Sequence, residues 1–293
     1  MTETIDITTS ASQNGTAPME TIQRVLVTPE LAADWLTRNS HNRPLRERFA
    51  QAYAQDMLNG DWTWTADPIR FAGDIASGPL VDGQHRLRAV VIAGESNPHI
   101  AIPMLVVFGL AERAQEDIDR GLPRKFHDVL HLRGEVNASA LAALIRRVHH
   151  WKQGNRRIQD MKFPYTSAQL LRTLDEHPEL REMVVSSRRV SETCSIPASI
   201  VGLAWWVCAQ IDEGDANYFF ERLGDGQGLA KTDPVYELRR VAATTKTIRG
   251  ARNMTYLLAI TIKAWNAYRA GQPIGQLRWA AGGAKPEAFP EPQ

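Results

Sequence analysis

The segment Leu80–Val90, LVDGQHRLRAV, holds the densest group of chemically capable side chains in this chain. An apolar run ends at Asp-Gly, and an amide, an imidazole and two guanidinium groups follow directly. A strand that ends at such a turn and continues as a helix directs the first amide groups of the helix toward one point, where an anion binds. Gly83 permits the sharp turn because it lacks a Cβ. The segment therefore predicts a phosphate-binding site.

The charged residues of this segment are expected to have different roles. Arg86 and Arg88 lie about 200° apart on a helix, so one can hold a phosphate while the other binds a carboxylate. Asp82 is the best-placed carboxylate for a metal ion or a base. Further carboxylate candidates are Glu47, Asp117 and Asp119. A plainer interpretation remains open, in which Asp82 caps the next helix and both arginines are solvated.

Two other polar groups are candidates for the same site. The segment 118–128, IDRGLPRKFHD, gathers charge around a helix-to-helix turn, and its candidate residues are Asp119, Arg120, Gly121, Arg124 and Lys125. Asn42 and Arg43 form a weaker candidate. Asn42 is also a good N-cap for the helix expected over 44–60, and we favour that role.

The elements that must position these residues form two unlike halves. Strands and helices alternate in the first half, which predicts a compact α/β (α+β) domain over 20–134. The expected strands are 21–29, 67–73, 78–83 and 100–109, and the expected helices are 28–39, 44–60, 84–93 and 111–119. Gly60 and Gly94 are expected to end two of these helices. Pro103 indicates the start of a strand or an edge position.

The second half contains helical patterns only. It predicts an all-α domain over 135–275, between a disordered tail at 1–19 and an extended Pro/Gly-rich tail at 276–293. A break is expected at Pro178, and the nearly all-apolar segment 197–214 is expected to be the central buried helix. Trp205, Trp206, Phe219 and Phe220 are expected in the core.

Two basic stretches of the second half indicate nucleic-acid binding. Segments 144–157 and 239–252 each hold five Lys or Arg residues and no acid. Phosphate contacts of this number give strong, salt-dependent binding, although such helix faces are also commonly just solvated. The candidate DNA contacts are Arg146, Arg147, Lys152, Arg156, Arg157, Arg239 and Arg240, with Trp151 available to stack on a base. No helix-turn-helix pattern is evident.

The motif DGQHRLRA resembles the signature loop of the ParB/sulfiredoxin-like superfamily. Gly83, Arg86, Arg88 and Ala89 match the Gly-Glu-Arg-Arg-x-Arg-Ala box of ParB proteins, and His85-Arg86 matches the Gly-Cys-His-Arg of sulfiredoxins. The motif is also similar to the DGQHR domain linked to DNA phosphorothioation control, and to ParB-like proteins of actinobacteria and their phages. The likeness covers about residues 22–134.

The resemblance implies a ParB/sulfiredoxin-like fold that binds a nucleoside triphosphate, ATP or CTP, with Mg²⁺. It places the cofactor on Gly83, His85, Arg86 and Arg88, and on Arg124 and Lys125 after the last strand. If phosphate is transferred, the expected metal ligand is Asp82, and the candidate catalytic residues are Asp82, Gln84 and His85. Gln84 stands where sulfiredoxins have cysteine, which excludes their reductase chemistry. It also stands where ParB has glutamate, and a neutral amide cannot act as a general base. The resemblance further implies DNA as a partner and a homodimer.

Composition limits the classes of protein to which this chain can belong. The 293 residues carry a formal charge of +1 and only two cysteines, Cys194 and Cys208, which fit no metal-ligand spacing. No apolar run approaches the roughly 20 residues of a membrane span, and a bacterial cytoplasmic protein is expected. Three function classes follow: a nucleotide-dependent DNA-binding switch, a kinase or NTPase acting on a small molecule or modified nucleotide, and a binding module that has lost nucleotide.

Overall fold

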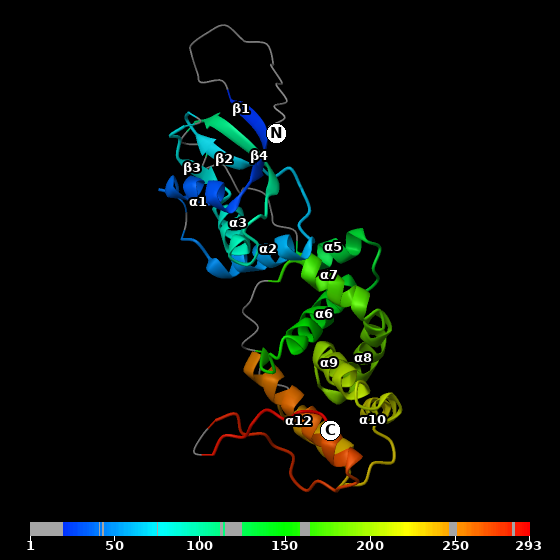
Figure 1. Cartoon of the computed structure of the whole chain (residues 1–293). Coiled ribbons are helices and arrows are strands. Elements are labelled where there is room, and N and C mark those ends of the chain that lie inside the picture. The colour runs from blue at the N-terminus through cyan, green and yellow to red at the C-terminus, as the bar shows by residue number, and fades with distance from the viewer. Residues whose placement is uncertain are drawn as a thin grey trace. The chain divides into compact units, whose positions relative to one another are not determined.

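Figure 1 shows a computed structural model of the chain, coloured from the N-terminus to the C-terminus. It describes residues 20–40, 42, 44–74, 76–111, 114, 125–158, 165–245, 251–282 and 285–293. The chain divides into two compact units, residues 1–123 with 164–169, and residues 124–163 with 170–293. The first unit is mixed α/β, and the described part of the second is helical, as the sequence predicts. The division precedes residue 134, so α5 (Phe126–Leu132) belongs to the helical unit.

A four-stranded sheet forms the frame of the first unit. The strands β1 (Thr21–Val27), β2 (Ile69–Ala72), β3 (Leu80–Asp82) and β4 (Ile102–Leu110) lie in the order β1-β4-β2-β3. The pairs β1–β4 and β2–β3 are antiparallel, and β2–β4 is parallel. Burial alternates along β4, which follows from the period of two in a strand that packs one face on a core. Pro103 lies at the start of this interior strand, one of the two expected positions.

The helices α1, α2 and α3 lie in the described part of the first unit, and two of their boundaries differ from expectation. Helix α1 (Pro29–Thr37) begins as predicted, with the Thr28 hydroxyl accepting from the Leu31 N–H at 3.3 Å. Helix α2 (Glu47–Asn59) ends at Gly60 as predicted, where φ is +76°. It begins only at Glu47, so the prediction that Asn42 caps it is wrong. The Asn42 amide instead donates to Leu80 O at 2.7 Å, which ties it to the sheet.

Helix α3 (Gln84–Ser96) runs past the glycine that was expected to end it. A Cβ on Gly94 would lie 2.5 Å from Cγ of Pro29, at the start of α1. Gly94 therefore permits the close approach of α3 to α1 and does not terminate the helix. This packing fixes α3 against the core of the first unit, which includes the rings of Trp35, Phe71 and Phe108.

The second unit is a set of packed helices (Figure 1). Besides α5, its described helices are α6 (Ala138–Lys152), α7 (Ser167–Glu176, which enters this unit at Leu170), α8 (Leu180–Cys194), α9 (Ala198–Ala209), α10 (Glu213–Asp225), α11 (Pro234–Thr245) and α12 (Ala251–Arg269). The predicted break at Pro178 separates α7 from α8. Helix α9 is buried on all sides from Ile200 to Cys208, so its prediction as the central helix is confirmed.

The predicted aromatic core and the C-terminal segment both lie in this unit. Trp205, Trp206, Phe219 and Phe220 are buried, as expected. The described part of 276–293 contains no helix or strand, but it is not a free tail. Trp279 is buried and donates to Ala288 O at 3.0 Å, and Trp265 of α12 donates to Gln293 O at 3.1 Å. The segment therefore folds back on itself and on α12.

The described helices were also compared with the length and hydropathy that a membrane crossing requires. None meets both requirements by itself. Helices α8 and α9 meet them only when taken together, and the chain bends by 119° between them. Both cysteines are free and buried.

Candidate functional site

The predicted strand–turn–helix arrangement is present at Asp82–Gly83. Gly83 has φ +107° and connects β3 to the first residue of α3. A Cβ at this position would lie 2.4 Å from Cδ1 and 3.3 Å from Cα of Ile69 in the adjacent strand. The position therefore requires glycine for two reasons: its φ is positive, and β2 lies too close to leave room for a Cβ.

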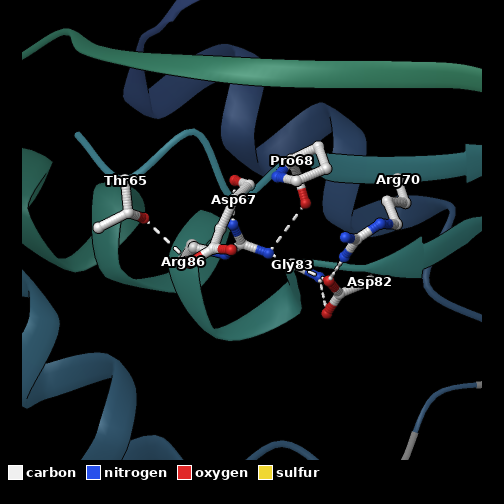
Figure 2. A network of polar contacts seen from close by, with 7 residues as sticks. All are labelled: Thr65, Asp67, Pro68, Arg70, Asp82, Gly83 and Arg86. Carbon is white, nitrogen blue, oxygen red and sulfur yellow. Dashed lines mark hydrogen bonds and ion pairs between the residues drawn. The ribbon is translucent and has the colours of Figure 1, made fainter. Parts of the chain in front are cut away.

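A network of charges holds this turn in place (Figure 2). One carboxylate oxygen of Asp82 accepts from Arg70 at 2.5 Å and from Arg86 at 3.1 Å, and the other accepts from the Gly83 N–H at 2.7 Å. The Arg86 guanidinium also donates to the backbone oxygens of Asp67 and Pro68. Arg86 thus joins the chain that enters β2 to the first turn of α3. It is neither solvated nor a freely available phosphate clamp.

The network decides what Asp82 can do. Both of its oxygens accept from donors of the protein, and two of those donors are cationic. Among the described residues, no group of three or more His, Cys, Asp and Glu side chains could hold a metal ion. The residues at this turn do not fit the Mg²⁺ site expected at Asp82. Two guanidinium groups, those of Arg70 and Arg86, share the single carboxylate of Asp82.

Gln84 is part of a buried amide network. Its side chain is only 4% exposed, and its Oε1 accepts from the Asn39 amide at 3.0 Å. The Asn42 amide in turn donates to Asn39 Oδ1 at 2.6 Å. These side-chain hydrogen bonds connect Asn39 and Asn42, which follow α1 in the sequence, to Gln84 at the start of α3. The expected catalytic role of Gln84 gives way to a positioning role.

His85 faces the start of α2. Its Nε2 accepts from the Arg46 N–H at 3.1 Å, and its ring packs edge-on to Phe49 at 6.1 Å between centroids. The accepting nitrogen carries no proton, so the neutral ring has its proton on Nδ1. Arg46 is the N-cap residue of α2 and its side chain makes no cap bond. His85 therefore supplies an acceptor for an N–H at the start of α2.

Arg88 and Glu47 bind each other, as the division of roles between the two arginines predicts. Nε and Nη2 of Arg88 donate to one oxygen of Glu47 at 2.9 and 2.6 Å. Hydrogen bonding to Glu47 raises the pKa of Arg88. The pair links α3 to α2. Neither residue remains a free phosphate or metal ligand in this arrangement.

The second and third candidate groups are described only in part. Asp117, Asp119, Arg120, Gly121, Arg124 and Arg43, together with most of the expected helix 111–119, lie outside the described residues. Lys125 is exposed at the start of α5, where its backbone N–H donates to Asp128 at 2.8 Å. It belongs to the helical unit.

Most of the predicted DNA contacts bind other parts of the protein. Lys152 pairs with Glu176 at 2.5 Å, and Arg240 pairs with Glu237 at 2.6 Å. Arg239 donates to backbone oxygens at the end of α10. These contacts neutralise or occupy cations that the sequence presents as one basic surface.

Arg156 and Arg147 are engaged as well. Arg156 pairs with Glu291 at 2.6 Å and lies 4.0 Å from the Trp151 ring centroid, so the ring expected to stack on a base is covered by a guanidinium group. Arg147 donates to the Ser199 hydroxyl at 2.9 Å and to the thioether of Met254 at 3.2 Å.

Arg146 and Arg157 are the remaining members of the predicted set. Both are exposed, and no carboxylate in the described ranges forms an ion pair with either. Arg146 lies 5.9 Å from the Phe126 ring centroid, which orients it over α5. The surface available for phosphate contacts on the described helices is therefore much smaller than the sequence indicates.

Of the two histidines in the first basic stretch, His150 is buried and His149 is half-buried. His150 is 3% exposed, and burial, together with the nearby His149 and Arg147, lowers its pKa to about 4. Burial also lowers the pKa of His149, whose ring contacts the Thr173 hydroxyl at 2.7 Å.

Acid should therefore destabilise the helical unit through His150. The unfolded chain takes up the proton near pH 6.5 and the folded chain only near pH 4. The free energy of unfolding should fall by about 3 kcal/mol over this window and level off below it. Urea denaturation at several pH values measures this fall, and His150→Gln should remove most of it. An unchanged pH dependence in that variant would contradict the assignment.

Sequence reasoning missed two of the residues that build the turn. Arg70 reads as an ordinary strand residue, and Asn39 as the end of a helix. Their roles depend on register: the pairing of β2 with β3 places Arg70 opposite Asp82. An arginine within a short apolar strand was the available signal.

The chain was also compared with known proteins. No protein-family model matches it, and the curated proteins contain no match to its sequence. The assignment of function therefore depends on the geometry described above and on the motif itself.

Proposed function

We propose that the first unit binds a nucleoside triphosphate, ATP or CTP, with its phosphates on the Asp82–Gly83 turn and the first turn of α3. One observation carries this proposal. A 13-residue helix begins at a glycine turn with no acidic residue in its first turn, beside the guanidinium groups of Arg70 and Arg86. The helix dipole and these two cations favour an anion at the same point.

The proposal is for binding, not for hydrolysis. Each residue with an expected catalytic role is engaged: Asp82 by two arginines, Gln84 by Asn39, and His85 by the Arg46 N–H. A general base must reach the attacking group with a free lone pair. We expect Mg²⁺, where it accompanies the triphosphate, to use phosphate oxygens rather than Asp82.

The resemblance to the ParB/sulfiredoxin-like superfamily supports the same proposal. The mixed four-stranded sheet and the helix that follows the motif provide the framework that such a loop needs. We further propose that duplex DNA is the partner of the helical unit, with Arg146 and Arg157 as phosphate contacts. Their exposure and the absence of a described ion-pair partner support this part. The implied homodimer stays a prediction.

Titration calorimetry with ATP and CTP tests the proposal when the affinity of the wild type is compared with that of variants at His85. In His85→Glu the carboxylate can still accept from the Arg46 N–H, and an acid is favourable at a helix N-terminus. The variant should remain folded but repel phosphate, which lowers affinity by about tenfold or more. His85→Gln is the matched control, because it keeps a neutral acceptor and should bind like the wild type.

The same titrations separate the function classes. Equal binding of wild type and His85→Glu would contradict the phosphate site. Formation of ADP or CDP would favour the kinase or NTPase alternative over the binding proposal. A change of nucleotide affinity on adding duplex DNA would favour a switch. Failure of both nucleotides to bind would favour a module that has lost nucleotide.

A further inference from the structure

A hollow of about 230 Å³ lies in the helical unit, away from the turn that carries the proposed function. It is bordered by α6, α8 and the start of α9, which pack against one another (Figure 1). The lining residues are Ala140, Ala143, Leu144, Val184, Ser187, Arg188, Ala198 and Ser199. Its walls are mostly small aliphatic side chains, and none of the lining residues is acidic.

Arg188 supplies positive charge in the wall of this hollow, and Arg147 lies next to the wall. Arg188 lines it and donates to the Asn137 side chain at 2.7 Å. Arg147 lies on the same face of α6 as the lining residues Ala140, Ala143 and Leu144, because these positions follow the helical spacing. It binds Ser199, which also lines the hollow. No carboxylate in the described part of the chain forms an ion pair with either arginine.

Arg147 is a half-buried cation, and no carboxylate among the described residues pairs with it. Burial lowers its pKa to about 10, so the group is still cationic at neutral pH. Its hydrogen-bond partners in the described chain are a hydroxyl and a thioether, which neutralise no charge. Desolvating a cation is costly unless an anion pairs with it. The folded chain therefore holds a guanidinium group that an incoming anion would stabilise.

The start of α9 adds a third favourable feature. The helix begins at Ala198, and its N-cap residue, Pro197, makes no side-chain cap bond. The lining residues Ala198 and Ser199 belong to its first turn, where amide groups and the helix dipole favour negative charge. A Cβ on Gly202 would lie 3.0 Å from Cδ1 of Leu144, so the glycine allows α9 to approach this wall of the hollow closely.

We propose that this hollow binds a small organic anion, a carboxylate with a short apolar body. The carboxylate would lie between Arg188, Ser199 and Arg147, and the apolar body would lie against Ala140, Ala143 and Val184. The size of the hollow suits a ligand of a few carbon atoms, since sites for larger ligands are commonly 300 Å³ or more. This site is independent of the triphosphate site in the first unit.

A binding assay with the full chain tests the proposal. Butyrate, hexanoate and benzoate are the probes, and calorimetry and thermal denaturation are the readouts. At least one carboxylate should bind with a stoichiometry of one and raise the melting temperature. Its amide should bind about tenfold more weakly or worse, because the charge-assisted bonds are lost. Inorganic phosphate, which has no apolar body, should also bind more weakly. Failure of all three carboxylates would overturn the proposal.

Three variants locate the site. Arg188→Gln removes an exposed cation and should weaken the carboxylate about tenfold without loss of fold. Ala143→Leu fills the hollow and should abolish binding while leaving both arginines in place. Arg147→Met should abolish binding and raise the melting temperature of the ligand-free chain, because it removes a desolvated charge. If Arg147→Met lowers the melting temperature instead, Arg147 is a structural brace and the proposal fails.

Discussion

Replacing Gly83 with alanine is expected to lower the free energy of unfolding of the first unit by about 3 kcal/mol. Two costs add. A non-glycine residue at φ +107° is strained, and the new Cβ would come within 2.4 Å of the buried Ile69 side chain. Each cost is on the order of 1–3 kcal/mol. Urea denaturation followed by circular dichroism measures the change.

Gly60→Ala is the matched control for this substitution. Gly60 also has a positive φ, +76°, but nothing lies within 4 Å of the position its Cβ would take. The control should cost about 1 kcal/mol, from backbone strain alone. Equal losses in the two variants would show that the close approach of β2 to the turn contributes nothing, against the geometry described.

Arg86→Ala is expected to destabilise the first unit by about 2–3 kcal/mol and to abolish triphosphate binding. The loss of stability is expected because Arg86 donates to Asp67 O, Pro68 O and the Asp82 carboxylate. Removing it leaves these partly buried acceptors without their cationic donor. Urea denaturation reports the first effect and calorimetry the second.

Arg88→Ala is the control that distinguishes the ion pairs at the turn from an ion pair further along α3. Arg88 lies two residues further on and pairs with a half-exposed Glu47. Such a pair contributes about 0.5 kcal/mol, so the variant should be nearly as stable as the wild type and should keep nucleotide affinity. If Arg88→Ala loses as much stability as Arg86→Ala, the special role assigned to the Asp82 network is wrong.

The elements near the turn were predictable because local chemistry determines them. Thr28 and Pro29 start α1, Gly60 ends α2, and the Asp-Gly step joins β3 to α3. Two helix boundaries were not predictable in this way: the start of α2 at Glu47 and the end of α3 at Ser96. Gly94 looked like a stop signal, but its role is to let α3 approach Pro29, a contact between residues far apart in the sequence.

The functional surface was harder to predict than the fold for a similar reason. A basic stretch in a sequence does not show which of its charges are paired. Glu291 is 135 positions from Arg156, and Met254 is 107 positions from Arg147. Such partners exist only after the helices pack. The strand register that places Arg70 opposite Asp82 is likewise a property of the folded sheet.

The central claim is that the turn at Gly83 holds a triphosphate, and amide chemical shifts test it most directly. ¹H–¹⁵N spectra of the full chain would be recorded during titration with ATP and with CTP. The account predicts that the largest shifts fall on the amides of Gly83, Gln84, His85 and Arg86, and that His85→Glu needs about tenfold more nucleotide, or more, to reach the same shifts. Saturable binding with those four amides unmoved would contradict it, and so would spectra that neither nucleotide changes.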